Sequence, residues 1–398
     1  MDKITELLTR GVDQILPNKE ELEKLLRSGK KLRVYQGFDP TSPGLHIGHM
    51  IGLKKLRQWQ DLGHEVIFLI GDFTGMTGDP TGRDKTREPL TREQVLENAK
   101  TYKDQAGRIL RFTGENAVKI KYNSEWLSKL SALESARLMS LFSIQQILER
   151  DMFQQRLKKD QEVSMVEVMY PIMQGYDSVA MDVDVEVGGR DQLFNMMMGR
   201  DMMRKIKGKN KFVMTTPLLT DAAGEKIGKT EGNAIALTDK PEDLFAKIMG
   251  LPDETIGKGF EYLTNVPMSE VENIHTKLNI EKNPIEFKKR LAFEIVRELN
   301  NDEDAKRAQE HFEKTVQKKE LPEDIPTFEM KAEDHLVITE LLVRAGLVES
   351  KSDAKRLVEQ GAVEVDSDRV DSPSEEIIPE DNMLIKSGKR NFIRIKLR

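Results

Sequence analysis

The sequence predicts an α/β protein built on a doubly wound parallel sheet, and two stretches near its start support this prediction. Residues 31–40, KLRVYQGFDP, are typical of a strand that runs into a polar loop, and a helical pattern follows them. Residues 66–70 form an uninterrupted apolar run between a charged residue and a glycine, as in a strand buried on both faces. A strand, a helix and a second strand with a glycine-rich exit begin a doubly wound domain, in which ligands bind beyond the carboxyl ends of the strands.

The remaining elements follow from the spacing of apolar residues. Apolar residues from Met50 to Leu62 recur at every third position of the first helix, which drifts around its axis, so we expect burial on more than one side. Residues 88–165 are helical in pattern. Strand-like segments at 181–189 and 210–220 flank a methionine-rich helix, whose five methionines we assign to the hydrophobic core.

These patterns predict several domains, as the length of 398 residues also suggests. Residues 1–235 form the α/β domain, with a helical insertion at about 120–165. Residues 236–320 form an α-helical domain, and residues 321–334 form a charged linker with two prolines. Residues 335–398 read as helix, turn, helix and short strands, which indicates a small α+β domain.

Composition excludes some classes of function. The chain has no cysteine, which excludes disulfides and thiolate metal sites and fits a reducing compartment. The net charge of -6 does not decide whether nucleic acid binds, because that depends on local clustering. The first residues lack the apolar core of a signal peptide, and no window reaches the roughly 18 apolar residues of a membrane span. We therefore expect a cytoplasmic protein without a membrane association.

Two histidines stand three residues apart in residues 37–50, GFDPTSPGLHIGHM. A zinc site would need further ligands, which are missing from this stretch. The spacing of His46 and His49 places both rings on one face of the first turn of a helix, where backbone N–H groups and the helix dipole favour anions. Gly48 lets a ligand approach the backbone, and Thr41 adds a hydroxyl. Taken alone, the pair is also compatible with a structural role, but its position after a strand and a polar loop favours a nucleotide triphosphate.

A second loop carries basic residues after an apolar strand. Lys226, Lys229 and Thr230 lie between glycines in LLTDAAGEKIGKTEGN. Such lysines are often only solvated charges. Beside a triphosphate site they become natural partners for pyrophosphate oxygens.

A polar stripe occurs in residues 170–177, YPIMQGYD. Tyr170, Gln174 and Asp177 are spaced by four and three residues, so they share one face of a helix. A polar stripe that points inward is unfavourable unless it binds something, whereas one that points outward is simply solvated. This stretch alone leaves both alternatives open.

Two motifs together indicate a family. HIGH at 46–49 and KIGKT at 226–230 have the order and separation of the two signatures of class I aminoacyl-tRNA synthetases, which carry them on a Rossmann-type domain. From about residue 30 to its end, the chain resembles the bacterial tyrosyl-tRNA synthetases. The resemblance rests on the segments VYQGFDPT, GDFTGMTGDPTGRDKTR, YPIMQGYD and VEVGGRDQLFN.

The resemblance implies a substrate pocket for tyrosine. Tyr170, Gln174 and Asp79 would hold the ammonium group of the amino acid. Tyr35 and Asp177 would contact its phenol hydroxyl. Phenylalanine would leave these groups unpaired, so a separate editing domain is not expected, and we find no segment for one.

The resemblance also implies roles toward ATP, which is a substrate here. His46, His49 and Thr41 would stabilise the triphosphate, and Lys226, Lys229 and Thr230 would close over the pyrophosphate. The residues expected to bind ATP or the adenylate are Gly37, Asp39, Gly48, Gly189, Asp191, Gln192 and Lys229. Arg83 and Arg87 are weaker candidates for the pyrophosphate. Mg²⁺ would arrive with ATP, and no protein-bound metal or organic cofactor is expected.

The sequence departs from the family pattern at two places. The lysine loop reads KIGKT instead of KMSKS, although both lysines and the terminal hydroxyl residue are present. Leu193 follows Gln192 where many relatives have an aromatic residue, which we expect to affect packing rather than chemistry.

The end of the chain resembles the S4-like RNA-binding fold of bacterial tyrosyl enzymes. Ser352 is expected to cap its second helix and Gly361 to end it. The last sixteen residues contain six basic residues and no acidic one, which favours tRNA binding. The candidate tRNA contacts are Lys355, Arg356, Lys389, Arg390 and Arg394, with Arg344 and Lys351 as possible extensions of the patch.

The resemblance implies a homodimer joined through the insertion at about 120–165, although its apolar residues would also suit contacts within one chain. Two other functions stay open from the sequence. A tryptophanyl relative shares the fold and the signatures, but Tyr35 with Asp177 argues against it, because an indole offers only a donor whereas a phenol hydroxyl both donates and accepts. A catalytically inactive RNA-binding paralogue is disfavoured by the intact histidines and lysines.

Overall fold

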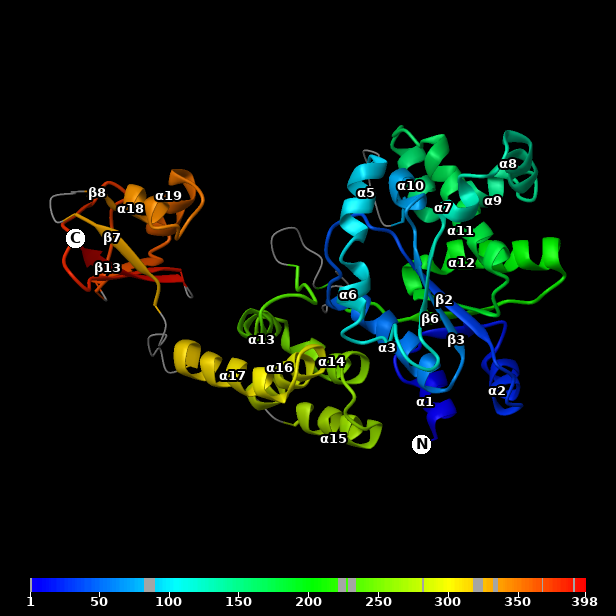
Figure 1. Cartoon of the computed structure of the whole chain (residues 1–398), viewed down its shortest axis with the longest axis horizontal. Coiled ribbons are helices and arrows are strands. Elements are labelled where there is room, and N and C mark those ends of the chain that lie inside the picture. Colours follow the sequence, from blue (N-terminus) through cyan, green and yellow to red (C-terminus); the bar gives the residue numbers. More distant parts are fainter. Residues whose placement is uncertain are drawn as a thin grey trace. The chain divides into compact units, whose positions relative to one another are not determined.

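The computed structural model describes residues 2–81, 90–220, 227, 234–280, 283–317, 325–331, 336–366, 368–388 and 391–398. The chain divides into two compact units, residues 1–306 and 307–398 (Figure 1). The predicted helical domain, up to residue 306, lies in the same compact unit as the α/β domain. Among the described residues, no helix is both long and apolar enough to cross a membrane.

The first unit is organised around a six-stranded sheet. Its strands are β1 (Gln14–Leu16), β2 (Arg33–Phe38), β3 (Glu65–Ile70), β4 (Lys119–Tyr122), β5 (Val185–Gly189) and β6 (Phe212–Thr216). Their order is β1-β6-β5-β2-β3-β4, with β2 to β6 parallel and β1 antiparallel at one edge. This confirms the doubly wound parallel sheet that the sequence predicts.

The strand order locates the ligand crevice. From β2 the chain moves outward to β3 and β4 and then returns to the other side of β2 as β5. The topological switch point therefore lies between β2 and β5, where Tyr35 pairs with Glu186. Ligands of doubly wound sheets bind at the carboxyl end of such a point.

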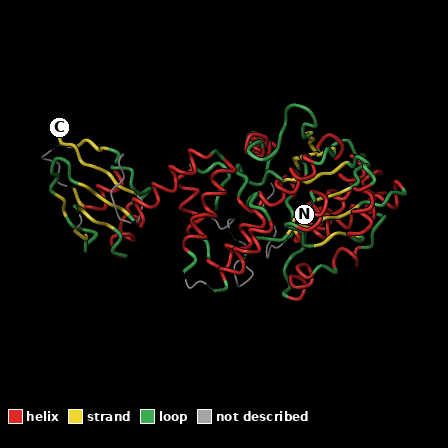
Figure 2. The backbone as a smooth tube through the Cα atoms, turned by 90° about the horizontal axis from the view of Figure 1, so that it is seen from below, coloured by secondary structure: helices red, strands yellow, loops and turns green. Residues whose placement is uncertain are grey.

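Helices flank this sheet (Figure 2). They are α1 (Lys3–Thr9), α2 (Lys19–Arg27), α3 (Ile47–Asp61), α4 (Thr74–Thr77), α5 (Arg92–Ala99), α6 (Tyr102–Ala106), α7 (Ser124–Leu127), α8 (Ala132–Met139), α9 (Ile144–Leu148), α10 (Asp151–Lys158), α11 (Met165–Met181), η1 (Arg190–Gln192), α12 (Leu193–Met202) and η2 (Met203–Lys207). Helix α3 packs against β2, β3 and β5, and its buried residues include Met50, Trp59 and the polar Gln60. Burial on more than one side is thus confirmed.

The methionine-rich helix α12 packs against α11, β5 and β6. Met196, Met198, Met202 and Met203 are buried, whereas Met197 is half-buried, so the prediction of a core position holds for four of the five methionines. Met196 also lines the pocket described below. Helix α11 begins with a capping box of Ser164 and Glu167, which satisfies backbone groups at its first turn.

A helical segment completes the first unit and continues into the second. Its elements are α13 (Pro241–Met249), η3 (Asp253–Thr255), α14 (Ile256–Leu263), α15 (Met268–Leu278), α16 (Ile285–Leu299), α17 (Asp302–Phe312) and η4 (Glu313–Gln317). Helix α14 packs against α3. The buried guanidinium of Arg10 reinforces this attachment by donating to the backbone oxygens of Phe260, Glu261 and Thr264.

The second unit is an α+β domain. Its elements are β7 (Thr327–Met330), β8 (Leu336–Val337), α18 (Ile338–Arg344), α19 (Lys351–Glu359), β9 (Val363–Val365), β10 (Asp368–Arg369), β11 (Glu376–Ile377), β12 (Leu384–Ser387) and β13 (Asn391–Leu397). A five-stranded sheet has the order β10-β9-β12-β13-β7, and β8 pairs with β11. Ile338, Leu342, Val358, Ile385 and Ile395 belong to its buried core.

Several local predictions need correction. Residues 327–330 of the predicted linker form β7, which pairs in parallel with β13. The structure also contains β1 and β4, which the sequence patterns did not indicate; β4 has no buried residue and β1 has one, so neither shows a clear apolar run. Ser350, not Ser352, caps α19 by accepting from the backbone N–H of Asp353. Gly361 lies just beyond the end of α19 with a φ of 66°, as predicted.

Candidate active site

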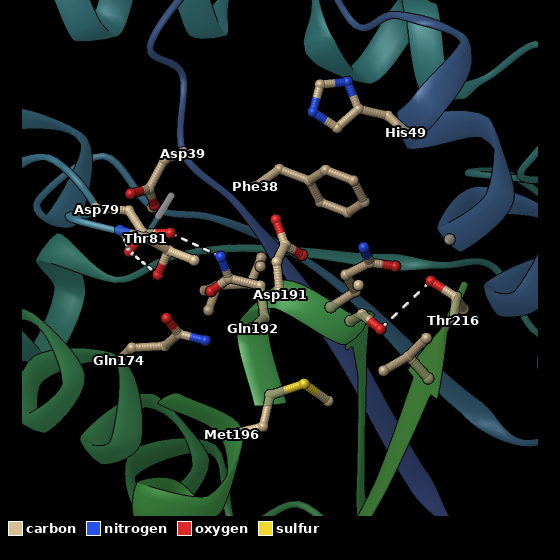
Figure 3. Close-up of a pocket in the computed structure, with 18 of the residues that line it drawn as sticks. Phe38, Asp39, His49, Asp79, Thr81, Gln174, Asp191, Gln192, Met196 and Thr216 are labelled. Carbon is tan, nitrogen blue, oxygen red and sulfur yellow. Dashed lines mark hydrogen bonds between the residues drawn. The ribbon is translucent and has the colours of Figure 1, made fainter. Parts of the chain in front are cut away.

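One pocket at the switch point gathers fourteen of the residues that the sequence singles out (Figure 3). They are Tyr35, Gly37, Asp39, Thr41, His46, Gly48, His49, Asp79, Tyr170, Gln174, Asp177, Gly189, Asp191 and Gln192. Their position in one cavity is a finding, whereas the individual roles remain predictions.

The two histidines build the start of α3. The backbone N–H of Gly48 donates to Nδ1 of His46 at 3.1 Å, and the backbone N–H of His46 donates to Nδ1 of His49 at 3.1 Å. The ring centroids are 3.9 Å apart. Because each Nδ1 is an acceptor, the proton of each neutral ring lies on Nε2. The pair is therefore structural and also presents defined donor atoms at a helix N-terminus that favours anions.

The structure gives a further reason for a glycine at position 48, besides the predicted approach of a ligand. A Cβ at this position would lie 2.9 Å from Cε1 and 3.0 Å from Nδ1 of His46. The His46 ring thus occupies the position that a side chain at residue 48 would take. Glycine is needed here because it lets His46 fold back over the helix start.

The deep end of the pocket surrounds Asp177 and Tyr35. Trp126 Nε1 donates to Asp177 Oδ1 at 2.7 Å, and Asn123 Nδ2 donates to Oδ2 at 3.3 Å. Burial raises the pKa of Asp177 well above its usual range. The hydrogen bonds from Trp126 and Asn123 act in the opposite direction and lower this pKa, but burial has the larger effect. The hydroxyl of Tyr35 is 2.8 Å from Ser178 Oγ. Burial and the charges of Glu186 and Asp177 raise the pKa of Tyr35, so its hydroxyl stays protonated.

The predicted ammonium site brings together Tyr170, Gln174 and Asp79 from separate segments. Gln174 Oε1 is buried and has no hydrogen-bond partner among the described residues. Asp79 Oδ2 accepts from Gln192 Nε2 at 2.6 Å, and Figure 3 shows this amide directed at the carboxylate. Tyr170 donates from its hydroxyl to Asp39 Oδ2 at 2.7 Å. An unpaired acceptor beside a carboxylate suits a cationic group.

Asp39 is tied to the predicted tyrosine site as well as to the end of β2. Besides Tyr170, its Oδ1 accepts from Thr74 Oγ1 at 2.7 Å. A Cβ on Gly71 would lie 1.9 Å from Oδ1, so a glycine is required for Asp39 to take this position. Asp39 thus holds Tyr170 and Thr74 in place through hydrogen bonds, a structural role that the predicted ATP role did not include.

The end of β5 leads into the predicted adenylate site. A Cβ on Gly189 would lie 2.5 Å from Asp191 Oδ1, so the side chain of Asp191 folds closely over this glycine. Gln192 accepts from Asn195 Nδ2 at 3.0 Å through its Oε1 while it donates to Asp79. Two opposed hydrogen bonds therefore fix the orientation of the Gln192 amide.

Both ends of the lysine loop are anchored at this pocket. The backbone N–H of Ile227 donates to the oxygen of Leu219 at 2.9 Å, and both residues line the pocket. At the other end, Ala236 forms a bridge with His46, and Ile47 N–H donates to Ile235 O at 2.9 Å. The loop thus begins at the pocket and ends beside His46. Several predicted residues lie outside the described residues: Arg83, Arg87, Lys226, Lys229, Thr230, Lys389 and Arg390.

Two of the candidate tRNA residues of the second unit, Lys355 and Arg356, lie at its surface. Lys355 and Arg356 project from α19 with side chains 63% and 66% exposed. Each lies near an acidic neighbour, Glu359 at 3.8 Å and Asp353 at 2.9 Å respectively, and such exposed pairs are weak. Arg394 donates to the backbone oxygen of Asn382 at 3.2 Å.

Sequence reasoning missed a set of polar residues that hold the site together. They are Thr74, Asn123, Trp126, Arg150, Ser178, Glu186 and Lys211. Glu186 gave a signal, because it interrupts the apolar strand VEVGG. The others are ordinary helix or loop residues in sequence. Among the described residues, no group of three or more His, Asp or Glu side chains is placed to hold a metal ion.

Comparison with known proteins defines first the class of this fold and site. The family model "tRNA synthetases class I (W and Y)" matches residues 27–317, and "Tyrosine--tRNA ligase SYY-like C-terminal domain" matches residues 317–395. The chain has the class I aminoacyl-tRNA synthetase fold.

Individual relatives narrow this class. The chain is 42% identical to the tyrosine–tRNA ligase of Thermotoga maritima over 392 residues, which span 98% of this chain and 96% of that protein. It is 42% identical to the enzyme of the same name from Aquifex aeolicus over 390 residues, 98% of this chain and 97% of that protein. A solved, C-terminally truncated mitochondrial tyrosyl-tRNA synthetase from Coccidioides posadasii superposes with a TM-score of 0.65 at 26% identity, over 78% of this chain and 91% of that one. This chain belongs to the tyrosine–tRNA ligase family.

Proposed function

We propose that this protein joins L-tyrosine to tRNA(Tyr) in two steps. The carboxylate of tyrosine attacks the α-phosphorus of ATP, which forms tyrosyl-adenylate and releases pyrophosphate. A ribose hydroxyl of the terminal adenosine of tRNA(Tyr) then attacks the tyrosyl carbonyl and releases AMP. The observation that carries the proposal is the pocket at the switch point, which combines buried oxygens for a phenol hydroxyl and acceptors for an ammonium group with the two histidines.

The deep end of the pocket would select the phenol. Asp177 and Tyr35 both offer oxygens near one another, and both are buried. A substrate without a hydroxyl leaves such groups unpaired, which is costly away from water. Tyrosyl-tRNA synthetases as a known class reject phenylalanine by roughly 10⁵-fold without editing, a magnitude that comes from that class and not from this structure.

The ammonium group would lie between Gln174, Tyr170 and Asp79. Gln174 Oε1 is a buried acceptor without a hydrogen-bond partner among the described residues. The carboxylate of Asp79 supplies the opposite charge. This arrangement would hold the amino end of tyrosine in the same pocket as His46 and His49.

Activation would need positioning and charge stabilisation rather than a general base, because the substrate carboxylate is already a nucleophile at neutral pH. Nε2–H of His46 and His49 would donate to phosphate oxygens as the bond from the α-phosphorus to pyrophosphate breaks. Lys226, Lys229 and Thr230 would close over the leaving pyrophosphate from a loop whose ends lie at the pocket. Mg²⁺ would enter as part of the substrate MgATP.

Amino-acid-dependent exchange of pyrophosphate into ATP tests this proposal. Tyrosine, phenylalanine and tryptophan are assayed in parallel with the wild-type chain, His46→Ala and Lys229→Ala. His311→Ala is the matched control because His311 is an exposed histidine outside the pocket. Exchange with tyrosine alone, lost in His46→Ala and Lys229→Ala only, is expected. Exchange with tryptophan would overturn the pocket assignment, and no exchange with any amino acid would point to an RNA-binding paralogue.

The second unit is proposed to bind tRNA(Tyr) through its basic residues, including Lys355, Arg356 and Arg394. Support comes from the exposure of the two α19 residues and from the match to a tyrosine–tRNA ligase C-terminal domain. The S4-like character of this unit stays a prediction. Because aminoacylation uses cellular tRNA, we place the protein in the cytoplasm.

A homodimer is proposed through the helices between residues 120 and 166. Several large apolar side chains are exposed there: Leu133, Ile144, Leu157, Met165 and Val166. Exposed apolar side chains gathered in one segment indicate a protein interface. Sedimentation of the Leu133→Glu and Met165→Glu double variant should give a monomer where the wild type gives a dimer, and an unchanged dimer would contradict this interface.

A further inference from the structure

A fully buried lysine lies behind the deep end of the pocket. Lys211 has 0% exposure and stands immediately before β6. Its ammonium group donates to Ser178 Oγ at 2.9 Å, to the backbone oxygen of Met196 at 3.1 Å and to the carboxylate of Glu186. Three donors thus meet three acceptors. Lys211 does not line the pocket itself, and the predicted reaction assigns it no role.

The surrounding helices are built to enclose this ammonium group. A Cβ on Gly199 of α12 would lie 2.7 Å from Lys211 Nζ and 2.8 Å from Ser178 Oγ. Gly175 of α11 faces the same point, and a Cβ there would lie 3.1 Å from the backbone nitrogen of Gly199. The two glycines let α11 and α12 approach closely around the lysine. A larger residue at position 199 would displace the ammonium group.

Two partners of Lys211 lead into the pocket. Ser178 Oγ is 2.8 Å from the hydroxyl of Tyr35. Glu186, which lines the pocket, accepts from Gln174 Nε2 at 3.4 Å. Lys211 is therefore one residue removed from both ends of the proposed tyrosine site, the phenol end at Tyr35 and the ammonium end at Gln174.

The direction of these hydrogen bonds follows from the charges. An ammonium group only donates, so Ser178 Oγ accepts from Lys211. The hydrogen of Ser178 is directed at the Glu186 carboxylate, 3.4 Å away. The hydroxyl of Tyr35 must then donate to Ser178, and its oxygen can only accept from a ligand. A substrate phenol donates to that oxygen, whereas phenylalanine cannot.

We infer that Lys211 is a positioning residue for substrate selection: by donating to both Ser178 Oγ and Glu186 it directs the Ser178 hydrogen at Glu186, and so fixes Tyr35 as an acceptor toward the substrate hydroxyl. This inference rests on the proposed tyrosine pocket. Without Lys211, Ser178 Oγ loses the donor that occupies one of its lone pairs, so the direction of the Ser178 hydrogen is no longer fixed. Ser178 can then turn its hydrogen toward Tyr35, and Tyr35 then points its own hydrogen into the pocket.

The test compares Lys211→Met with the wild type in the full chain. Pyrophosphate exchange is measured over ranges of tyrosine, phenylalanine and ATP concentration. The ratio of kcat/KM for tyrosine to that for phenylalanine should fall by roughly 10- to 100-fold, since a phenol then meets a misdirected donor. KM for tyrosine should rise, while KM for ATP should stay unchanged. A purely structural lysine would change the amount of active enzyme and leave this ratio alone.

Two further variants show whether a change in the tyrosine-to-phenylalanine ratio comes from the position of Lys211 or from the loss of any buried lysine. Lys55→Met removes another buried lysine of the same unit, which donates to the backbone oxygen of Leu7 and lies outside the pocket. It should leave the tyrosine-to-phenylalanine ratio at the wild-type value. Lys211→Met combined with Glu186→Gln removes both charges of the pair, so it should fold even if Lys211→Met does not, and it should still show a lowered ratio.

A wild-type ratio in Lys211→Met, or in the double variant, would overturn the inference. The proposed function is tested separately by the wild-type chain, because exchange that does not depend on tyrosine would contradict the pocket itself. Tyrosine-dependent exchange in the wild type with no loss of selectivity in either Lys211 variant would contradict only the role of Lys211.

Discussion

Replacing Gly48 by alanine should change the free energy of unfolding little and lower the catalytic activity strongly. The new Cβ would lie 2.9 Å from Cε1 of His46, so the ring must move, and its hydrogen bond from the backbone N–H of residue 48 is lost. A lost N-cap destabilises a helix by about 1 kcal/mol, whereas alanine in place of glycine within a helix stabilises it by about 1 kcal/mol. The free energy of unfolding should therefore change by less than about 1 kcal/mol.

Tyrosine-dependent pyrophosphate exchange should fall much more than stability in Gly48→Ala. His46 is proposed to donate to the triphosphate, and removing one such donor typically lowers kcat by about 10²- to 10³-fold. We expect a fall of about 100-fold in tyrosine-dependent pyrophosphate exchange, with urea unfolding close to that of the wild type. Gly44→Ala is the matched control, because a Cβ at position 44 would point into open space, and it should keep wild-type exchange. Wild-type exchange in Gly48→Ala would refute the reasoning that the glycine exists to place His46.

Three further predictions concern other parts of the molecule. Trp126→Phe removes the donor to Asp177, so the pKa of Asp177 should rise further and KM for tyrosine should increase by about 10-fold in exchange assays, with KM for ATP unaffected. Burial lowers the pKa of Lys55 to about 7, below its unfolded value, so the unfolded chain binds the extra proton between about pH 7 and 10. The free energy of unfolding of the wild type should therefore rise over this range relative to Lys55→Met, by at most about 1.4 kcal/mol per pH unit, and parallel urea-unfolding profiles would contradict this. Lys355→Glu with Arg356→Glu should lower kcat/KM for tRNA charging by about 10-fold, most strongly at low salt, while exchange stays unchanged; an equal loss in both assays would indicate misfolding instead.

Periodicity in the sequence was enough to predict the architecture that carries the site. The apolar run of β3, the three-residue drift of α3 and the glycine-rich exits of the strands were all correctly interpreted, because buried faces impose a pattern on the residues that form them. The four-and-three spacing of Tyr170, Gln174 and Asp177 also predicted a common helix face, and the structure turns that face into the pocket. Edge strands β1 and β4 escaped notice because they bury too little to leave such a pattern.

Only the tertiary structure decided how these side chains are paired. Asp39 meets Tyr170, 131 residues later, and Asp177 meets Trp126, 51 residues earlier. Lys211 and Glu186 are separated by 25 residues and form a pair because α11 and α12 close over them at Gly175 and Gly199. The sequence by itself determined which faces are buried and which motifs the chain carries, since both are local properties. The polarity of the pocket depends on long-range contacts and on the exclusion of water, and these exist only once the sheet has brought distant segments together.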